Sequence, residues 1–244
     1  MSAPEPSIVI GTPGKWKDRS EIVTSIAQHS DGYLFAGNIL MHAESGAHFE
    51  IDIYEHDPSL KESVRSGGMG QIAEEDIDAL GEHTFTLYLL SDETGRGVVE
   101  SIMDAVVGLL DAGGLLVKIE TAGFSVSSDQ WREHTSVKAP YSLYRAMVAL
   151  VGEDQEYFTC GMGAFDFPDC TVLDRGLEGA FEVATEFCCY MMDEMPKFAE
   201  GHTFSPPEGV DRYVLSFEDY TYYPPGDLFH NPNGLWKLKP KNLG

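Results

Sequence analysis

The stretch TFTLYLLSDETGRGVVESIMDAVVGLLDAGGLLVKIE, residues 84–120, decides the fold class. Its first seven residues are rich in β-formers and predict a strand. Residues 97–111 then carry apolar side chains at helical spacing, which predict an amphipathic helix. The residues of this apolar face are Val98, Ile102, Ala105, Val106 and Leu109. Because Gly113-Gly114 predicts the helix end and LLVKIE predicts another strand, the stretch indicates a strand–helix–strand succession.

The rest of the chain alternates in the same way between β-rich runs and helical patterns. Strands are predicted over residues 8–10, 33–43, 48–56, 156–162, 170–173, 212–223 and 235–239, and helices over 19–29 and 177–195. Residues 33–43 and 48–56 should pair as a hairpin around Ser45-Gly46. Residues 142–151 fit a strand or a helix. This order indicates an α+β fold, a mostly antiparallel mixed sheet with helices packed on it.

A polar run with Pro140, residues 131–142, is the best candidate for a boundary inside the chain. It divides an N-terminal α+β half, residues 1–135, from an acidic C-terminal α+β half, residues 136–244. The pattern leaves open whether these are two similar halves or parts of one continuous domain.

The segment SIVIGTPGKWKDRSEIV, residues 7–23, resembles a phosphate-binding loop but lacks its chemistry. Such a loop needs a longer span between its glycines and a hydroxyl directly after the lysine. Here Gly11 and Gly14 are three residues apart, and Trp16 follows the lysine. We therefore expect a strand, a turn at Pro13-Gly14 and a helix whose start is capped by Asp18 and Glu21.

Composition limits the classes of partner. The chain of 244 residues has 40 acidic and 16 basic residues, a net charge of −24. Such a surface repels nucleic acid and anionic membranes and attracts a cationic partner. The four cysteines lack C-x-x-C spacing, and no secretory signal or membrane span is evident. We therefore expect a cytoplasmic protein with reduced thiols, without disulfides, zinc or another cofactor.

The predicted helix over 177–195 has one apolar and one acidic stripe. The apolar stripe contains Leu177, Phe181, Ala184, Cys188, Met191, Met192 and Met195. The acidic stripe, called the carboxylate row below, consists of Glu178, Glu182, Glu186 and Asp193. Like charges four residues apart destabilise a helix by roughly 0.2–0.5 kcal/mol per pair. The row should therefore face water, an arginine of the same fold, or a basic surface on another molecule.

The predicted hairpin offers a candidate metal site. Alternation places His48, Glu50 and Asp52 on one face of the second strand. With a three-residue loop at Ser45-Gly46-Ala47, His42 would lie opposite Glu50. Imidazoles and carboxylates of this kind bind zinc or manganese. A solvated sheet face is the alternative interpretation.

No catalytic motif for nucleophilic or dinucleotide chemistry is present. The chain lacks a G-x-S-x-G elbow and an H-E-x-x-H pair, and GRG at 95–97 is too short for a dinucleotide fingerprint. Cys160 has no neighbouring base in the sequence and is expected to be a buried strand residue. No catalytic residue is therefore predicted.

Three segments together are similar to a known family. The run CGMGAFDFPDCTVLD, residues 160–174, is followed by a helix and EGHTF, and residues 97–131 add a helix, a glycine turn and a strand. Over about residues 84–204 the chain resembles the bacterial domain of unknown function (DUF) 4261 family. Gly201-His202-Thr203 has histidine where that family usually has aspartate, which puts that residue's role here in doubt. The resemblance implies a bacterial α+β domain and no established activity.

These observations favour a non-enzymatic, acidic, cytoplasmic binding protein whose carboxylate row meets a basic protein partner. An immunity or antitoxin-type inhibitor is the concrete version, because nuclease-like toxins carry cationic clefts. The alternative is a metal-assisted hydrolase that uses His42, His48, Glu50 and Asp52. A homo-oligomer is a third hypothesis.

Overall fold

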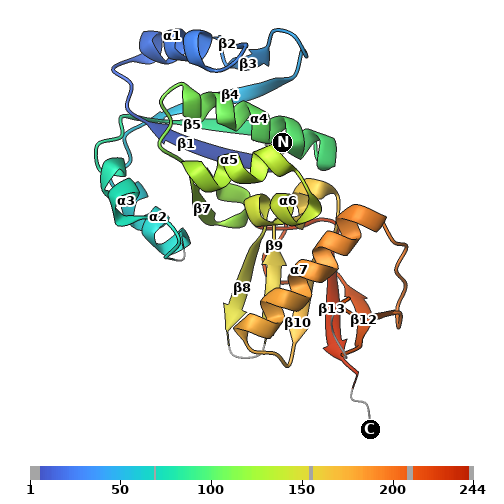
Figure 1. The fold of residues 1–244 in the computed structure, drawn as a ribbon. Helices are drawn as coiled ribbons and strands as arrows, with labels where there is room; N and C mark the ends of the chain where they lie inside the picture. The colour runs from blue at the N-terminus through green and yellow to red at the C-terminus, as the bar shows by residue number, and fades with distance from the viewer. Residues whose placement is uncertain (1–5, 69, 154–155, 208–210, 242–244) are drawn as a thin grey trace. The chain divides into compact units, whose positions relative to one another are not determined.

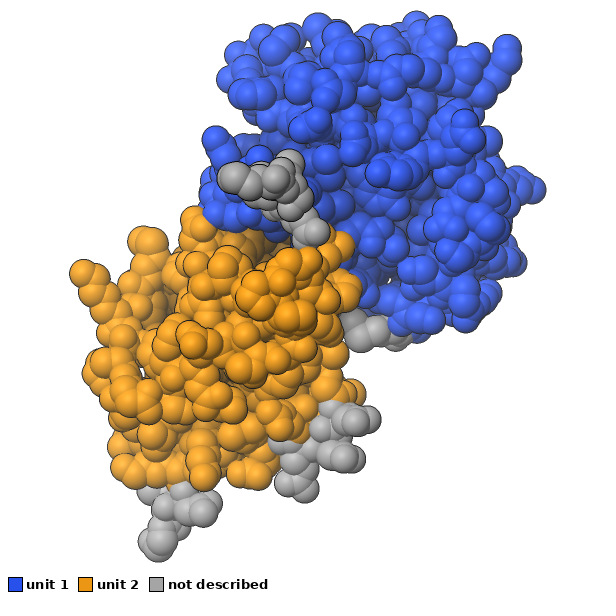
Figure 2. All heavy atoms as spheres, turned by 180° about the vertical axis from the view of Figure 1, so that it is seen from behind, with its two compact units in different colours: residues 1–138 blue, residues 139–244 orange. Residues whose placement is uncertain are grey.

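The computed structural model describes residues 6–68, 70–153, 156–207 and 211–241. The chain divides into two compact units, residues 1–138 and 139–244 (Figures 1 and 2). This division lies inside the polar segment 131–142. Each unit combines helices with a mostly antiparallel sheet, which confirms the α+β class predicted from the sequence.

Unit 1 is built on a sheet whose described strands run in the order β2-β3-β4-β5-β1-β6-β7. The strands are β1 (Ile8–Gly14), β2 (Tyr33–Ala36), β3 (Ile39–His42), β4 (His48–Glu55), β5 (Phe85–Ser91), β6 (Leu116–Ile119) and β7 (Phe124–Ser127). All neighbouring pairs are antiparallel. The β1 strand is buried along its whole length, because it lies between β5 and β6. The strand predicted over 33–43 is wrong: a turn at Gly37-Asn38 divides it into β2 and β3.

The helices of unit 1 pack in two groups (Figure 1). They are α1 (Arg19–His29), α2 (Leu60–Gly67), α3 (Glu74–Leu80), α4 (Arg96–Asp111) and α5 (Ser128–Val137), with a short 3₁₀ turn η1 (Glu120–Ala122). The α4 helix contacts α1, α5 and β1. Its predicted apolar face is buried at Ile102, Ala105, Val106 and Leu109. The α2 and α3 helices form a separate small core with Leu116 of β6.

Trp16 explains the second glycine, Gly14, of the segment that resembles a phosphate loop. The indole is 2% exposed, and its Nε1 donates to the Ala112 carbonyl at 2.8 Å. A Cβ at Gly14 would lie 2.3 Å from this ring, so only glycine fits beneath it. The turn predicted at Pro13-Gly14 is wrong, because both residues continue β1 and pair with β5. Asp18 caps α1 as predicted, accepting from the Glu21 backbone N–H at 3.0 Å.

Unit 2 is built on a second sheet, with its described strands in the order β11-β12-β13-β10-β9-β8. The strands are β8 (Ala149–Glu153), β9 (Glu156–Cys160), β10 (Asp169–Leu173), β11 (Thr203–Phe204), β12 (Tyr213–Glu218) and β13 (Leu235–Pro240). The β10–β13 pair is parallel, and the other described pairs are antiparallel. The helices are α6 (Pro140–Met147) and α7 (Leu177–Glu194), with a 3₁₀ turn η2 (Met162–Phe165).

Residues 142–151, which fit either a strand or a helix, belong to both. The α6 helix begins with Pro140 in its first turn, where proline is favoured, and it ends at Met147. The β8 strand then begins at Ala149.

A buried polar network joins β9, β10 and the loop before β13. Asp169 is completely buried, and its carboxylate accepts from Thr159 Oγ1 at 2.8 Å and from Asn231 Nδ2 at 2.7 Å. The Met162 backbone N–H also donates to this carboxylate, at 3.3 Å. Burial raises the pKa of Asp169 to about 7, although these three donors oppose the shift.

Candidate functional site

The carboxylate row lies on the outer surface of α7. The side chains of Glu178, Glu182, Glu186 and Asp193 are all exposed. The opposite face packs against β8, β9 and β10 through buried apolar residues. Those residues are Ala180, Val183, Ala184, Phe187, Cys188, Met191 and Met192. The prediction that the apolar stripe is buried is wrong at two positions. Leu177 is 60% exposed and Met195 is 70% exposed at the helix ends.

The row is not neutralised by ion pairs in the part of the chain that the structure describes. Across the described residues, none of its four carboxylates forms an ion pair with lysine, arginine or histidine. Arg175 instead pairs with Asp211 and donates to the Tyr213 hydroxyl at 3.0 Å. The Arg145 guanidinium lies 5.4 Å from the Phe181 ring. The four carboxylates are therefore exposed to solvent without an ion-pair partner among the described residues.

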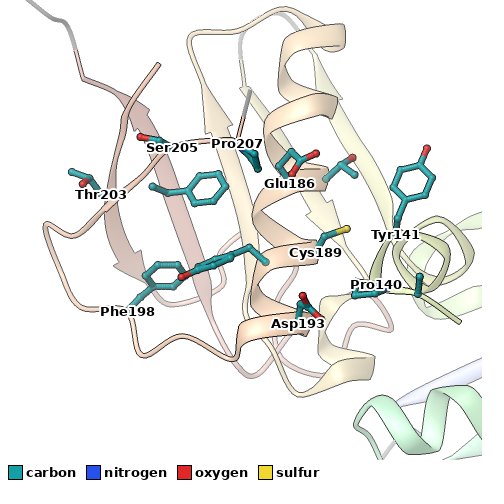
Figure 3. A pocket seen from close by; sticks show the side chains of 13 residues that line it. Pro140, Tyr141, Glu186, Cys189, Asp193, Phe198, Thr203, Ser205 and Pro207 are labelled. Atoms are coloured by element: carbon teal, nitrogen blue, oxygen red, sulfur yellow. The ribbon is translucent and has the colours of Figure 1, made fainter. Parts of the chain in front are cut away.

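A groove of about 610 Å³ lies beside the row (Figure 3). One wall is the face of α7 that carries Glu186, Cys189, Tyr190 and Asp193. On one side of α7, the segment that follows the helix contributes Phe198, Thr203, Phe204, Ser205 and Pro207 to the lining. The start of α6 closes a third side with Pro140 and Tyr141. Two carboxylates of the row thus line the groove, and no lysine, arginine or histidine side chain is among its described lining residues.

Aromatic packing holds the outer wall in place. Phe198 stacks on Phe187 with ring centroids 5.3 Å apart, and Phe204 meets the same ring edge-on at 5.1 Å. Tyr190 lies 6.1 Å from Phe198 and 6.0 Å from Phe204. Aromatic pairs at these distances add roughly 0.5–1.5 kcal/mol each beyond their burial. The groove wall is therefore anchored to the core under α7.

His202 shapes the turn that leads into this wall. Its Nδ1 accepts from the Ala199 backbone N–H at 3.3 Å, and Gly201 takes a left-handed φ of 78°. The next residue, Thr203, pairs with Val214 as β11 begins. The imidazole nitrogen here accepts from the backbone of its own turn, which is a role that aspartate often fills in turns.

The thiols of unit 2 are not set up as nucleophiles. Burial, with help from Glu186 and Asp193, raises the pKa of the Cys189 thiol to about 12. Burial also raises the pKa of Cys160 well above its ordinary value. The thiolate is the reactive form of cysteine, so neither residue is activated at neutral pH. The groove therefore offers binding groups rather than an assembled nucleophile.

The hairpin residues proposed as metal ligands do not share one face. Met41 pairs with His48, and Ile39 pairs with Glu50, so the expected pairing of His42 with Glu50 is wrong. His48, Glu50 and Asp52 are exposed on one side of β4. His42 lies on the other side, 4.8 Å from the Tyr33 ring, and its Nε2 is 3.0 Å from the Asp31 carbonyl. In the described chain, no three potential ligands of the His, Cys, Asp or Glu type come together.

The aromatic residues that follow α7 in the groove were not predicted from the sequence. Phe198 and Phe204 lie beyond the end of α7, in a segment with no regular periodicity. Their position six residues apart on either side of a glycine turn was the available signal.

The chain gives no match to models of known protein families, to curated proteins or to solved structures. The resemblance of residues 84–204 to the DUF4261 family stays a prediction. Among the described helices, none has the length and apolar run that crossing a bilayer requires.

Proposed function

We propose that this chain is a non-enzymatic binding protein that recognises a basic protein through the carboxylate row on α7. The observation that carries the proposal is the exposure of four carboxylates on one helix face without an ion pair in the described residues. Their mutual repulsion costs stability in the free protein. A cationic partner would relieve that repulsion and would associate faster because of the long-range attraction.

The charge of the whole chain supports the same class of partner. From Ala146 to Trp236 there are 17 acidic residues and three basic ones. A partner with a cationic cleft, such as a nuclease-like toxin, fits this surface, and the proposed role is then that of an immunity-type inhibitor in the cytoplasm. The four free cysteines, none in a disulfide, are consistent with a reducing compartment.

Charge reversal tests the proposal. The triple variant Glu178→Lys, Glu182→Lys, Glu186→Lys should lose a basic protein that the wild-type chain captures from its native cell. Capture by the wild type should weaken as salt rises from 50 to 300 mM, because exposed charge interactions are screened.

A matched control separates the row from net charge. The variant Glu44→Lys, Glu55→Lys, Glu75→Lys changes the charge equally at exposed positions of unit 1 that form no ion pair in the described structure. This control should retain the partner. If both triple variants lose it equally, or if the row variant captures the same proteins as the wild type, the row is not the recognition surface.

A further inference from the structure

The groove beside α7 has the dimensions and lining of a site for a basic peptide segment. Glu186 and Asp193 are seven residues apart on one helix, which places them about 10 Å apart along its axis. One guanidinium cannot span that distance, so two basic side chains are needed to meet both carboxylates.

The spacing of these two charges selects a backbone conformation. In a polyproline II segment, residues three apart point to the same side and are separated by about 9 Å. In a β-strand, residues two apart on one face are separated by about 6.8 Å, which is too short. A seven-residue helix also spans about 10 Å, so the chemistry of the groove lining decides between a helix and a polyproline II segment.

The uncharged lining agrees with the same occupant. Grooves that take polyproline II segments are lined by aromatic side chains, and Tyr141, Tyr190 and Phe198 line this one. Arginine is favoured over lysine, because its planar guanidinium stacks on aromatic faces and pairs with carboxylates through two parallel hydrogen bonds.

We propose that the groove binds an extended Arg-x-x-Arg segment of the basic partner, with one arginine at Glu186, the other at Asp193 and the chain between them against Tyr190. This inference rests on the proposed function and names the chemistry of the partner at that site. Within the carboxylate row, Glu186 and Asp193 contact the bound segment directly. Glu178 and Glu182 lie outside the groove and contribute only long-range electrostatic attraction.

The test uses blocked, fluorescently labelled peptides and the full chain, with binding followed by anisotropy at 50 mM salt. The sequence Gly-Arg-Pro-Pro-Arg-Gly has the proposed spacing. Gly-Arg-Pro-Arg-Pro-Gly has the same composition with the arginines two residues apart, and Gly-Gln-Pro-Pro-Gln-Gly is neutral. The first peptide should bind at least fivefold more tightly than the second, and the neutral peptide should not bind.

Paired variants separate the groove from the rest of the row. Glu186→Gln with Asp193→Asn should weaken binding of the first peptide more than tenfold, since each exposed charge pair contributes up to about fivefold. Glu178→Gln with Glu182→Gln removes the same charge from the same helix and should change binding less than twofold. Tyr190→Leu, at a 41% exposed position, should weaken binding about threefold, because leucine keeps an apolar contact but lacks the aromatic face.

Three results would overturn the inference. They are equal binding of the two arginine peptides, equal losses in the two double variants, and no binding of either arginine peptide. None of these results decides the proposed function, which is tested separately by the charge-reversal experiment. That experiment measures capture of the whole partner rather than binding of this segment.

Discussion

Asp169 should make unit 2 lose stability as the pH rises through neutrality. The carboxyl is completely buried, and its pKa of about 7 in the folded chain is raised from 3.8. The folded state therefore holds a proton that the unfolded chain has released. The stabilising contribution is fully present below about pH 4, declines as the pH rises and is lost above the folded pKa.

The size of the effect follows from the shift. At 1.36 kcal/mol per pKa unit, a rise of about three units corresponds to roughly 4 kcal/mol over the full range. Between pH 5 and pH 7.5 the linkage relation gives a loss of about 2.5 kcal/mol. The other carboxylates of the chain add their own pH dependence, so the quantity to measure is the difference between the wild type and a variant without this group.

Hydrogen–deuterium exchange of the β10 amides provides the local free energy of opening. The variant Asp169→Asn should remove about 2.5 kcal/mol of the pH dependence seen in the wild type between pH 5 and pH 7.5. Asp174→Asn, an exposed change just beyond the same strand, should leave the wild-type dependence intact. If Asp169→Asn keeps the wild-type dependence within 0.5 kcal/mol, the three donors outweigh burial and Asp169 is ionised throughout.

Two further predictions concern Trp16 and Cys189. Trp16→Ala removes a 2% exposed indole together with its hydrogen bond to Ala112. This variant should lower the free energy of unfolding, measured by urea titration, by about 3–5 kcal/mol, and Trp16→Phe should lower it clearly less. Equal losses in the two variants would show that the indole does not close over Gly14. Cys189, with its pKa near 12, should react with iodoacetamide at pH 8 about a thousandfold more slowly than a cysteine of ordinary pKa, as measured by peptide mass spectrometry. Glu186→Gln with Asp193→Asn should speed that reaction several-fold, and a wild-type rate within tenfold of glutathione's would contradict the shift.

The elements with strong local signals were predictable from the sequence. The strand–helix–strand succession at residues 84–120 appears as β5, α4 and β6, because sixteen residues of helix carry a continuous apolar face. The cap at Asp18 was predictable because the capping interaction is local in the chain.

The wrong predictions depend on geometry that is not local. The face taken by His42 follows from the hairpin register, and a shift of one residue moves a side chain to the other side of the sheet. Leu177 and Met195 fit the apolar period, but the ends of α7 extend past the buried part of the helix. The carboxylate row was visible in the sequence, whereas the groove beside it combines α6, α7 and the segment up to Pro207, which no periodicity connects.

The position of β13 has a consequence for biosynthesis. This strand, residues 235–240, is inserted between β10 and β12 in the middle of its sheet. Until the ribosome has synthesised β13, neither β10 nor β12 has the strand that pairs with both of them, and their hydrogen-bonding edges stay unpaired. Unit 1, by contrast, has all its described strands once residue 127 has emerged from the exit tunnel. During synthesis, unit 1 can therefore complete its sheet earlier than unit 2, and the unpaired strand edges of unit 2 stay exposed to aggregation for longer.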